Sequence, residues 1–238
     1  MQQIIDFFLQ PYLETSYLLI CLEFFAMVTG IMSVYYAKKE NILVFPVGIV
    51  STATYVYLLS QWQMYGDLII NIYYTLMSLY GWWVWCRVID EQTHQHTLIT
   101  RMSRKDYFST FAIFIFTSVF VIFIYRYYEV MPTSLGFMES AEHAWTNISS
   151  GSIAKLREAM PFIDTFTTGA AFSAMWLMAN KKLESWLAWI VVNIASVPLY
   201  FIKGYGFTGI QYFVFLVLAI YGYKEWVKNL EAQKATDI

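Results

Sequence analysis

Charged residues are scarce in this chain. Only 13% of its 238 residues are Asp, Glu, Lys or Arg, whereas a soluble domain carries about 25%. The net charge of −2 gives no reason to expect a nucleic-acid partner. This shortage of charge argues against an ordinary soluble domain.

Cysteine and catalytic motifs are also scarce. Cys21 and Cys86 are the two cysteines, they fall near opposite ends of different apolar runs, and no CxxC pair occurs. We therefore expect no disulfide. HExxH, GxGxxG and P-loop motifs are absent, as is an evident nucleophile with a base, so nothing suggests an enzyme, a metal or a cofactor. The first residues, MQQIIDFFLQ, lack the basic start of a cleavable signal peptide.

Apolar and aromatic residues make up most of the chain, at 58% and 20% respectively. They fall in blocks of about 20 residues, long enough to cross a bilayer core as helices. The sequence predicts an all-α integral membrane protein with seven transmembrane helices, at 17–37, 42–60, 65–86, 107–129, 161–180, 184–203 and 205–227.

The distribution of Lys and Arg predicts the orientation. Eleven of the fifteen basic residues fall on one side of these spans, among them Lys38, Lys39, Lys181 and Lys182. That side is expected to be cytoplasmic. The segment 1–16 and the loop 130–160 are then external, and the tail 228–238 is cytoplasmic. Within the external loop, HAWTNISSGSIAKLREAM (residues 143–160) predicts a short interfacial helix.

Two hexapeptides indicate an internal repeat. YGWWVW at 80–85 and YGYKEW at 221–226 share Tyr-Gly-aromatic-x-x-Trp and end two apolar runs 141 residues apart. At this offset residues 30–85 align without a gap, and the helix boundaries coincide. We therefore expect two parallel triple-helix bundles, 17–86 and 161–227. A cytoplasmic loop and linker helix at 87–129 would join them in a 3+1+3 layout.

Polar residues inside apolar spans are the candidates for function. The run WLAWIVVN places Trp186, Trp189 and Asn193 on one helix face, with Asn193 near the membrane midplane. In the third span, Asp67, Asn71, Tyr74 and Ser78 form a polar stripe, and Gln211 lies in the seventh span. The alternative for each is a hydrogen bond that only joins helices.

The spans carry no Lys or Arg at depth, so an anionic phosphate would meet no cationic partner. Tryptophan faces attract cations by about 0.5–2 kcal/mol. The residues favour a flat, aromatic ligand that is neutral or positive and carries hydroxyl or amide groups.

The WxxWxxxN run, the two Tyr-Gly span ends and the 3+1+3 layout resemble the bacterial nicotinamide riboside transporters of the PnuC family, over residues 20–228. That family's fold is similar to the SWEET sugar transporters. The resemblance implies uptake of nicotinamide riboside by facilitated diffusion, with trapping by a cytoplasmic riboside kinase. It also implies a homotrimer in the bacterial inner membrane. It assigns Trp186, Trp189 and Asn193 to the binding site, with Asn71 and Gln211 beside them.

Other interpretations of the sequence remain open. The ligand can be a different vitamin such as thiamin, or a sugar, on the same fold. The protein can be a receptor or scaffold whose polar residues only join helices. Proton coupling would need a titrating midplane carboxylate, for which Glu23 and Asp67 are the candidates. On the transport reading, Trp186 and Trp189 contact the ring, Asn193 and Gln211 the carboxamide, and Asn71 with Asp67 the ribose.

Overall fold

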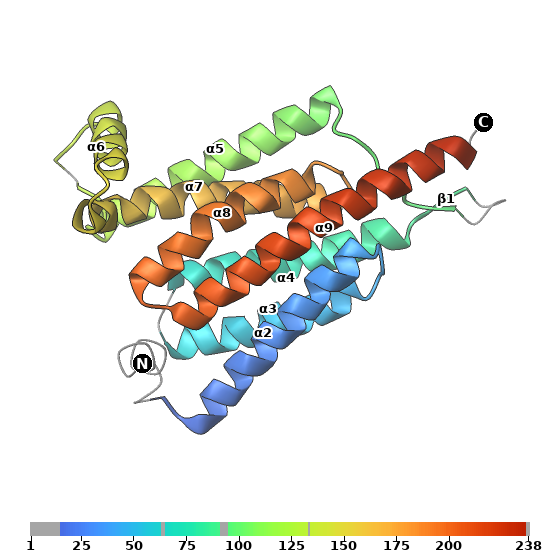
Figure 1. The fold of residues 1–238 in the computed structure, drawn as a ribbon, viewed down its shortest axis with the longest axis horizontal. Helices are drawn as coiled ribbons and strands as arrows, with labels where there is room; N and C mark the ends of the chain where they lie inside the picture. Colours follow the sequence, from blue (N-terminus) through green and yellow to red (C-terminus); the bar gives the residue numbers. More distant parts are fainter. Residues whose placement is uncertain (1–14, 63–64, 91–94, 133, 237–238) are drawn as a thin grey trace.

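The computed structural model describes residues 15–62, 65–90, 95–132 and 134–236, so most of the expected external segment 1–16 lies outside the described residues. The described part is built almost wholly of helices (Figure 1). They are α2 (Tyr17–Lys38), α3 (Val44–Gln61), α4 (Tyr65–Cys86), α5 (Arg104–Tyr127), α6 (Phe137–Ser149), α7 (Ile153–Ala179), α8 (Ser185–Lys203) and α9 (Gly206–Thr236). Two short antiparallel strands, β1 (Val88–Asp90) and β2 (Gln95–His96), follow α4.

Helices lie at the expected positions, but the bounds of α6, α7 and α9 differ most from those predicted. Helix α7 begins at Ile153 rather than 161, with Pro161 inside it. Pro161 lacks the N–H that a helix interior uses, yet the helix continues through it. The external loop contains α6, which begins six residues before the predicted interfacial helix and ends at Ser149. Helix α9 continues to Thr236, beyond the predicted end at 227.

Helices α4 and α7 stand apart from the other long helices. Among the described residues, α2, α3, α5, α8 and α9 are long and apolar enough to cross a membrane by length and composition, and α4 and α7 are not in this group. Helix α7 packs against α4, α5, α6 and α8, and it buries hydroxyls at Thr165, Thr167 and Ser173. A helix enclosed by other helices is shielded from lipid, so it tolerates such residues.

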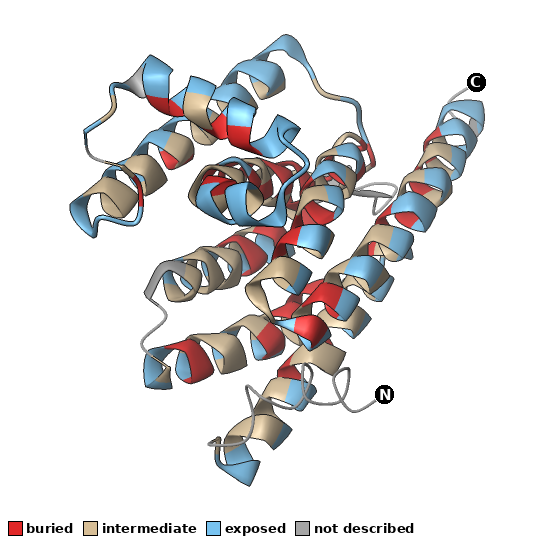
Figure 2. Cartoon of the chain, turned by 60° about the vertical axis from the view of Figure 1, so that its left-hand side comes forward, coloured by how far each residue is buried: buried red, intermediate tan, exposed pale blue. Residues whose placement is uncertain are grey.

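The helices pack in two consecutive sets, α2–α3–α4 and α7–α8–α9. We call these sets the first half and the second half. They meet where α2 contacts α9 and where α4 contacts α7, while α5 packs on α7. Small residues permit close approach: a side chain at Gly48 would meet Ser33, and one at Gly169 would meet Phe114 and Ser118 of α5. Buried residues lie where helices face one another, and exposed residues cover the outward faces (Figure 2).

The turns between the first two helices of each half have the same geometry. Glu40 and Lys181, 141 residues apart, both adopt a left-handed backbone, with φ of 52° and 54°. The amide of Asn41 donates to the Tyr36 carbonyl at 3.0 Å, and the amide of Lys182 donates to the Leu177 carbonyl at 2.9 Å. These bonds fall at the same offset of 141, so the repeat seen in the sequence is also a repeat of local structure.

The end of the bundle that carries these two turns holds Lys38, Lys39, Lys181 and Lys182, and we call it the basic end. Here each half packs a ring against a glycine and a tryptophan. Phe45 meets Trp85 edge-on at 5.0 Å, and Trp186 meets Trp226 edge-on at 5.5 Å. Trp85 and Trp226 also contact each other, with ring centroids 5.8 Å apart. Phe45, Trp85, Trp186 and Trp226 form one aromatic cluster that joins the halves.

The glycines beneath this cluster set its spacing. A Cβ at Gly222 would stand 2.7 Å from the Trp186 ring, and one at Gly81 would collide with Phe45. We expect Gly222→Ala to lower the thermal unfolding midpoint of the purified protein, because overpacking costs about 1–3 kcal/mol. Gly136→Ala is the matched control, since its Cβ meets only a Glu139 oxygen at 3.6 Å. An unchanged midpoint for Gly222→Ala would contradict the tight packing described here.

Candidate functional site

One face of α8 carries a polar and aromatic row of five residues. Successive spacings of three and four residues place Trp186, Trp189, Asn193, Ser196 and Tyr200 on this face. Asn193 is only 3% exposed, and none of the described residues hydrogen-bonds its carboxamide. A buried carboxamide normally has partners, so Asn193 is suited to bind a ligand group.

Trp189 contacts the polar stripe of α4 directly. Its ring meets Tyr74 edge-on, with centroids 6.1 Å apart. One turn earlier, Asn71 donates from Nδ2 to the Asp67 carbonyl at 2.9 Å, which leaves its side-chain oxygen as a free acceptor. Residues from α4 and α8, predicted separately, therefore meet between the halves.

Charged groups gather near the start of α4 and the end of α8. Lys203 donates to the Asp164 carboxylate at 2.6 Å, and its ammonium lies 5.5 Å from the Tyr200 ring centre. Asp67 interacts electrostatically with both Lys203 and Asp164, but no described residue pairs with its carboxylate as Asp164 pairs with Lys203. The Asp67 carboxyl group is therefore left for a ligand group to contact.

Gln211 lies on the other side of this region, where α9 meets α2 and α3. It is 7% exposed, and its side-chain oxygen accepts a hydrogen bond of 3.4 Å from the Tyr55 hydroxyl. Its side-chain nitrogen lies near the Cα of Gly30. The contacts thus tie Gln211 to the first half but do not join it to Trp189.

Trp186 is more deeply buried than Trp189, which packs against the same hydrophobic cluster. Trp186 is 1% exposed and belongs to the aromatic cluster at the basic end. Its indole N–H is buried, and no described residue accepts from it. The spacing therefore predicted the correct helix face, but the structure places Trp186 in the packed cluster.

Two tyrosines were missed by sequence reasoning. Tyr200 and Tyr212 stack with ring centroids 4.8 Å apart and planes 13° apart. Tyr200 continues the α8 row one heptad beyond Asn193, so extending that row would have found it. Tyr212 follows Gln211 and had no separate signal, because tyrosine is common throughout this sequence.

The described residues contain no group of three or more His, Cys, Asp or Glu side chains placed to hold a metal ion. Aromatic rings, carboxamides, hydroxyls and one carboxylate make up the candidate site. Such groups can bind a flat polar solute.

The fold and this set of residues define a helical membrane protein with a candidate polar site between its two halves. Residues 20–228 match the model of a family described as "Nicotinamide mononucleotide transporter". The chain belongs to this family, whose members are transporters and not enzymes.

Relatives and a solved structure extend the comparison. The chain is 22% identical over 210 residues to "Nicotinamide riboside transporter PnuC" of Escherichia coli K12, covering 85% of this chain and 83% of that protein. The PnuC protein of Neisseria mucosa is 25% identical, with 85% and 70% covered. The structure titled "Crystal structure of the Vitamin B3 transporter PnuC" is similar with a TM-score of 0.60 and 20% identity, covering 89% of this chain and 82% of that one. This structural likeness shows the fold.

The Lys203–Asp164 pair offers a test of local electrostatics. We expect Lys203→Met to lower the thermal unfolding midpoint. The substitution leaves the Asp164 carboxylate, whose side chain is 19% exposed, without its ion-pair partner. Lys39→Met removes a pair with Glu225 whose side chains are 44% and 38% exposed, and such solvent-exposed pairs contribute little to stability. The midpoints of both variants are measured by thermal denaturation. Equal losses would show that the Lys203 pair has no special role.

Proposed function

We propose that the chain takes up nicotinamide riboside by facilitated diffusion. The observation that carries the proposal is the contact of Trp189 with Tyr74 on the same α8 face as an unpartnered, buried Asn193. The relatives from Escherichia coli and Neisseria mucosa are named as transporters of this compound.

The substrate's chemistry suits these residues. Nicotinamide riboside carries a flat pyridinium cation, a carboxamide and ribose hydroxyls. Trp189 and Tyr74 can contact the ring. Asn193 and Gln211 offer carboxamides to the substrate's carboxamide. Asn71 offers an acceptor to the ribose, and Asp67 a negative charge to the cation.

A phosphorylated product would be a poor ligand for this site. Lys203 lies 5.5 Å from the ring centre of Tyr200 in the α8 row, but it is engaged with Asp164 at 2.6 Å. A phosphate prefers Arg or Lys donors that are free to bind it. The lack of a free cation for a phosphate, among the residues described at this site, favours the riboside as substrate over the mononucleotide named in the family description. It also supports trapping by a cytoplasmic kinase, which would give uptake a direction without ion coupling.

We further propose the membrane arrangement. Helices α2, α3, α4, α5, α7, α8 and α9 would cross as seven spans in a 3+1+3 layout. The basic end would face the cytoplasm of a bacterial cell, with the N-terminus outside. Helix α5 exposes Phe108, Phe111, Phe116 and Phe123, a surface suited to lipid or to neighbouring copies in a homotrimer.

A second vitamin remains the alternative substrate. The chain is 33% identical over 66 residues to "Riboflavin/roseoflavin transporter RibM" of Streptomyces davaonensis, covering 28% of this chain and 31% of that protein. The same fold can therefore present aromatic groups to another flat ring, such as riboflavin or thiamin.

Binding by calorimetry tests the substrate. We expect the purified protein to bind nicotinamide riboside but not its 5′-phosphate, thiamin or riboflavin. Asn193→Ala should weaken binding about 10- to 100-fold, since a lost buried hydrogen bond costs about 1–3 kcal/mol. Trp189→Ala should weaken it about tenfold or more. Binding of thiamin alone would retain the fold and change the substrate, and absence of any binding would favour the scaffold reading.

A separate prediction concerns the attraction between the Asp67 carboxylate and the positive ring of the substrate. Nicotinamide riboside and its neutral dihydro form share ribose and carboxamide but differ in the ring charge. We expect wild-type protein to prefer the cation and Asp67→Asn to lose most of this preference, because the carboxylate attracts the positive ring. Competition binding measures the ratio of affinities. If Asp67→Asn weakens both forms equally, Asp67 has a structural role instead.

A further inference from the structure

At the basic end, the repeat brings two equivalent residues of opposite charge together. Glu40 lies in the turn of the first half, and Lys181 lies at the matching position in the second. Their side chains form an ion pair at 3.0 Å, with side-chain exposures of 17% and 10%. Glu40 also accepts a hydrogen bond from Asn229 of α9. Glu40 of the first half therefore contacts two parts of the second half, the turn between α7 and α8 and the helix α9.

Lys181 has two further partners in the segment after the first half. Its ammonium donates to the Thr97 carbonyl at 2.7 Å and lies 4.8 Å from the centre of the Trp85 ring. Each contact is charge-assisted. The ammonium is thus held by a carboxylate, a carbonyl and a ring, all from outside its own half.

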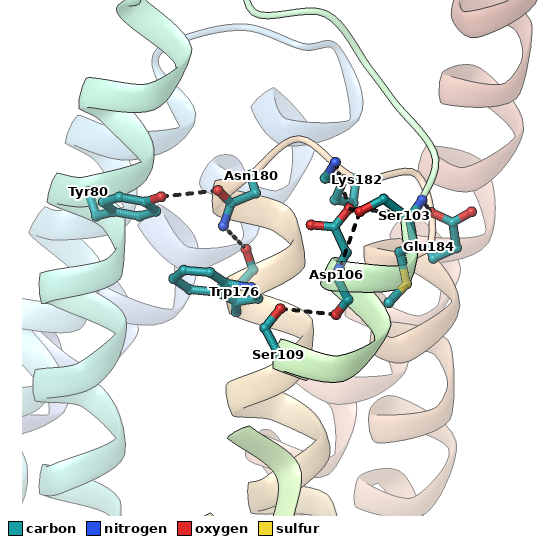
Figure 3. A network of polar contacts seen from close by, with 9 residues as sticks. Tyr80, Ser103, Asp106, Ser109, Trp176, Asn180, Lys182 and Glu184 are labelled. Carbon is teal, nitrogen blue, oxygen red and sulfur yellow. Dashed lines mark hydrogen bonds and ion pairs between the residues drawn. The ribbon is translucent and has the colours of Figure 1, made fainter. Parts of the chain in front are cut away.

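The segment 97–103 is itself attached to the same turn. Ile99 is 1% exposed, and the backbone of Thr100 bonds to Lys181 and to Leu183. Figure 3 shows Lys182 of this turn reaching Asp106, and Glu184 beside Ser103. Lys182 pairs with Asp106 at 3.0 Å, and Glu184 accepts from the Met102 amide at 3.0 Å. The turn is therefore fixed to the start of α5.

The ion pairs are unevenly distributed between the two ends. In the described part of the chain, the pairs that join the halves are Lys39–Glu225 and Glu40–Lys181, both at the basic end. The indole of Trp226 also donates across the halves here, to the Ala37 carbonyl at 3.0 Å. At the opposite end, Lys203 and Asp164 belong to the same half. The basic end is thus where ion pairs hold the two halves together.

We propose that Glu40 and Lys181, with Trp85 and Thr97, form an inner latch that opens when solute passes to the basic side. This inference rests on the proposed transport function. Opening this end must separate the two turns and so break the Glu40–Lys181 pair. Water that enters weakens the attraction between the separated charges. The pair therefore favours either a closed, dry state or an open, hydrated one, rather than states between them.

Distances measured without substrate test the latch independently of transport. Spin labels are placed on native Cys86 in the first half and on Cys introduced at Lys228 in the second, with Cys21→Ser. Both labelled positions are exposed. We expect Glu40→Gln and Lys181→Met to shift the population toward longer distances, raising the open-to-closed ratio about tenfold. The double variant should add little, because both changes remove one interaction.

Lys39→Gln is the matched control, because it breaks the more exposed of the two ion pairs that join the halves. It should leave the distance distribution unchanged. The latch is refuted if Glu40→Gln and Lys181→Met leave the distribution as in the wild type, or if Lys39→Gln shifts it equally.

A cross-link gives the complementary test. In a background with Cys21→Ser and Cys86→Ser, Glu40→Cys and Lys181→Cys are bridged by a reducible bifunctional thiol cross-linker, because the native contact joins the ends of two long side chains. Uptake of nicotinamide riboside should stop and should return on reduction, while binding from the opposite side persists. Undiminished uptake by the cross-linked protein would overturn the latch. If the reduced protein neither binds nor transports the riboside while the distance shift still occurs, the proposed substrate fails and the latch stands.

Discussion

Close packing of aromatic rings on glycine is the interaction on which the rest of this structure depends. In lipid there is little hydrophobic force between helices, so close contact holds them together. Gly222 admits the Trp186 ring, and Gly81 admits Phe45. Because Trp85 and Trp226 touch each other, these two contacts become a single junction between the halves. The ion pairs that join the halves lie at the same end of the bundle as this junction.

The positions at which the two halves differ are as informative as those they share. At the offset of 141, Trp189 corresponds to Gly48, Asn193 to Thr52 and Tyr212 to Asn71. Thr52 is satisfied by Thr75, with oxygens 2.7 Å apart, whereas Asn193 has no such bond among the described residues. The shared positions build turns and helix contacts. The divergent ones place rings and carboxamides between the halves, as an asymmetric solute requires.

The sequence was most informative about lengths and periods. Apolar runs of about 20 residues predicted α2, α3, α4 and α8 closely, because lipid sets the length of a spanning helix. The start of α7 was not predictable, since a proline such as Pro161 more often begins a helix than lies inside one. The spacing of Trp186, Trp189 and Asn193 predicted a shared face but not their depth. Trp186 joined the aromatic cluster because Gly222, far away in sequence, leaves space for its ring.

The asymmetry between the two ends also bears on mechanism. A ligand can shift a conformational equilibrium only by binding one state better than another. The candidate residues come from both halves: Tyr74 from α4, Trp189 and Asn193 from α8, and Gln211 from α9. A solute that contacts all of them favours states in which the halves are close around it. On the proposed transport function, release toward the basic end overcomes both these contacts and the cross-half ion pairs. Binding energy gained between the halves therefore has to be moderate, because a solute held too tightly would keep the halves closed and slow its own passage.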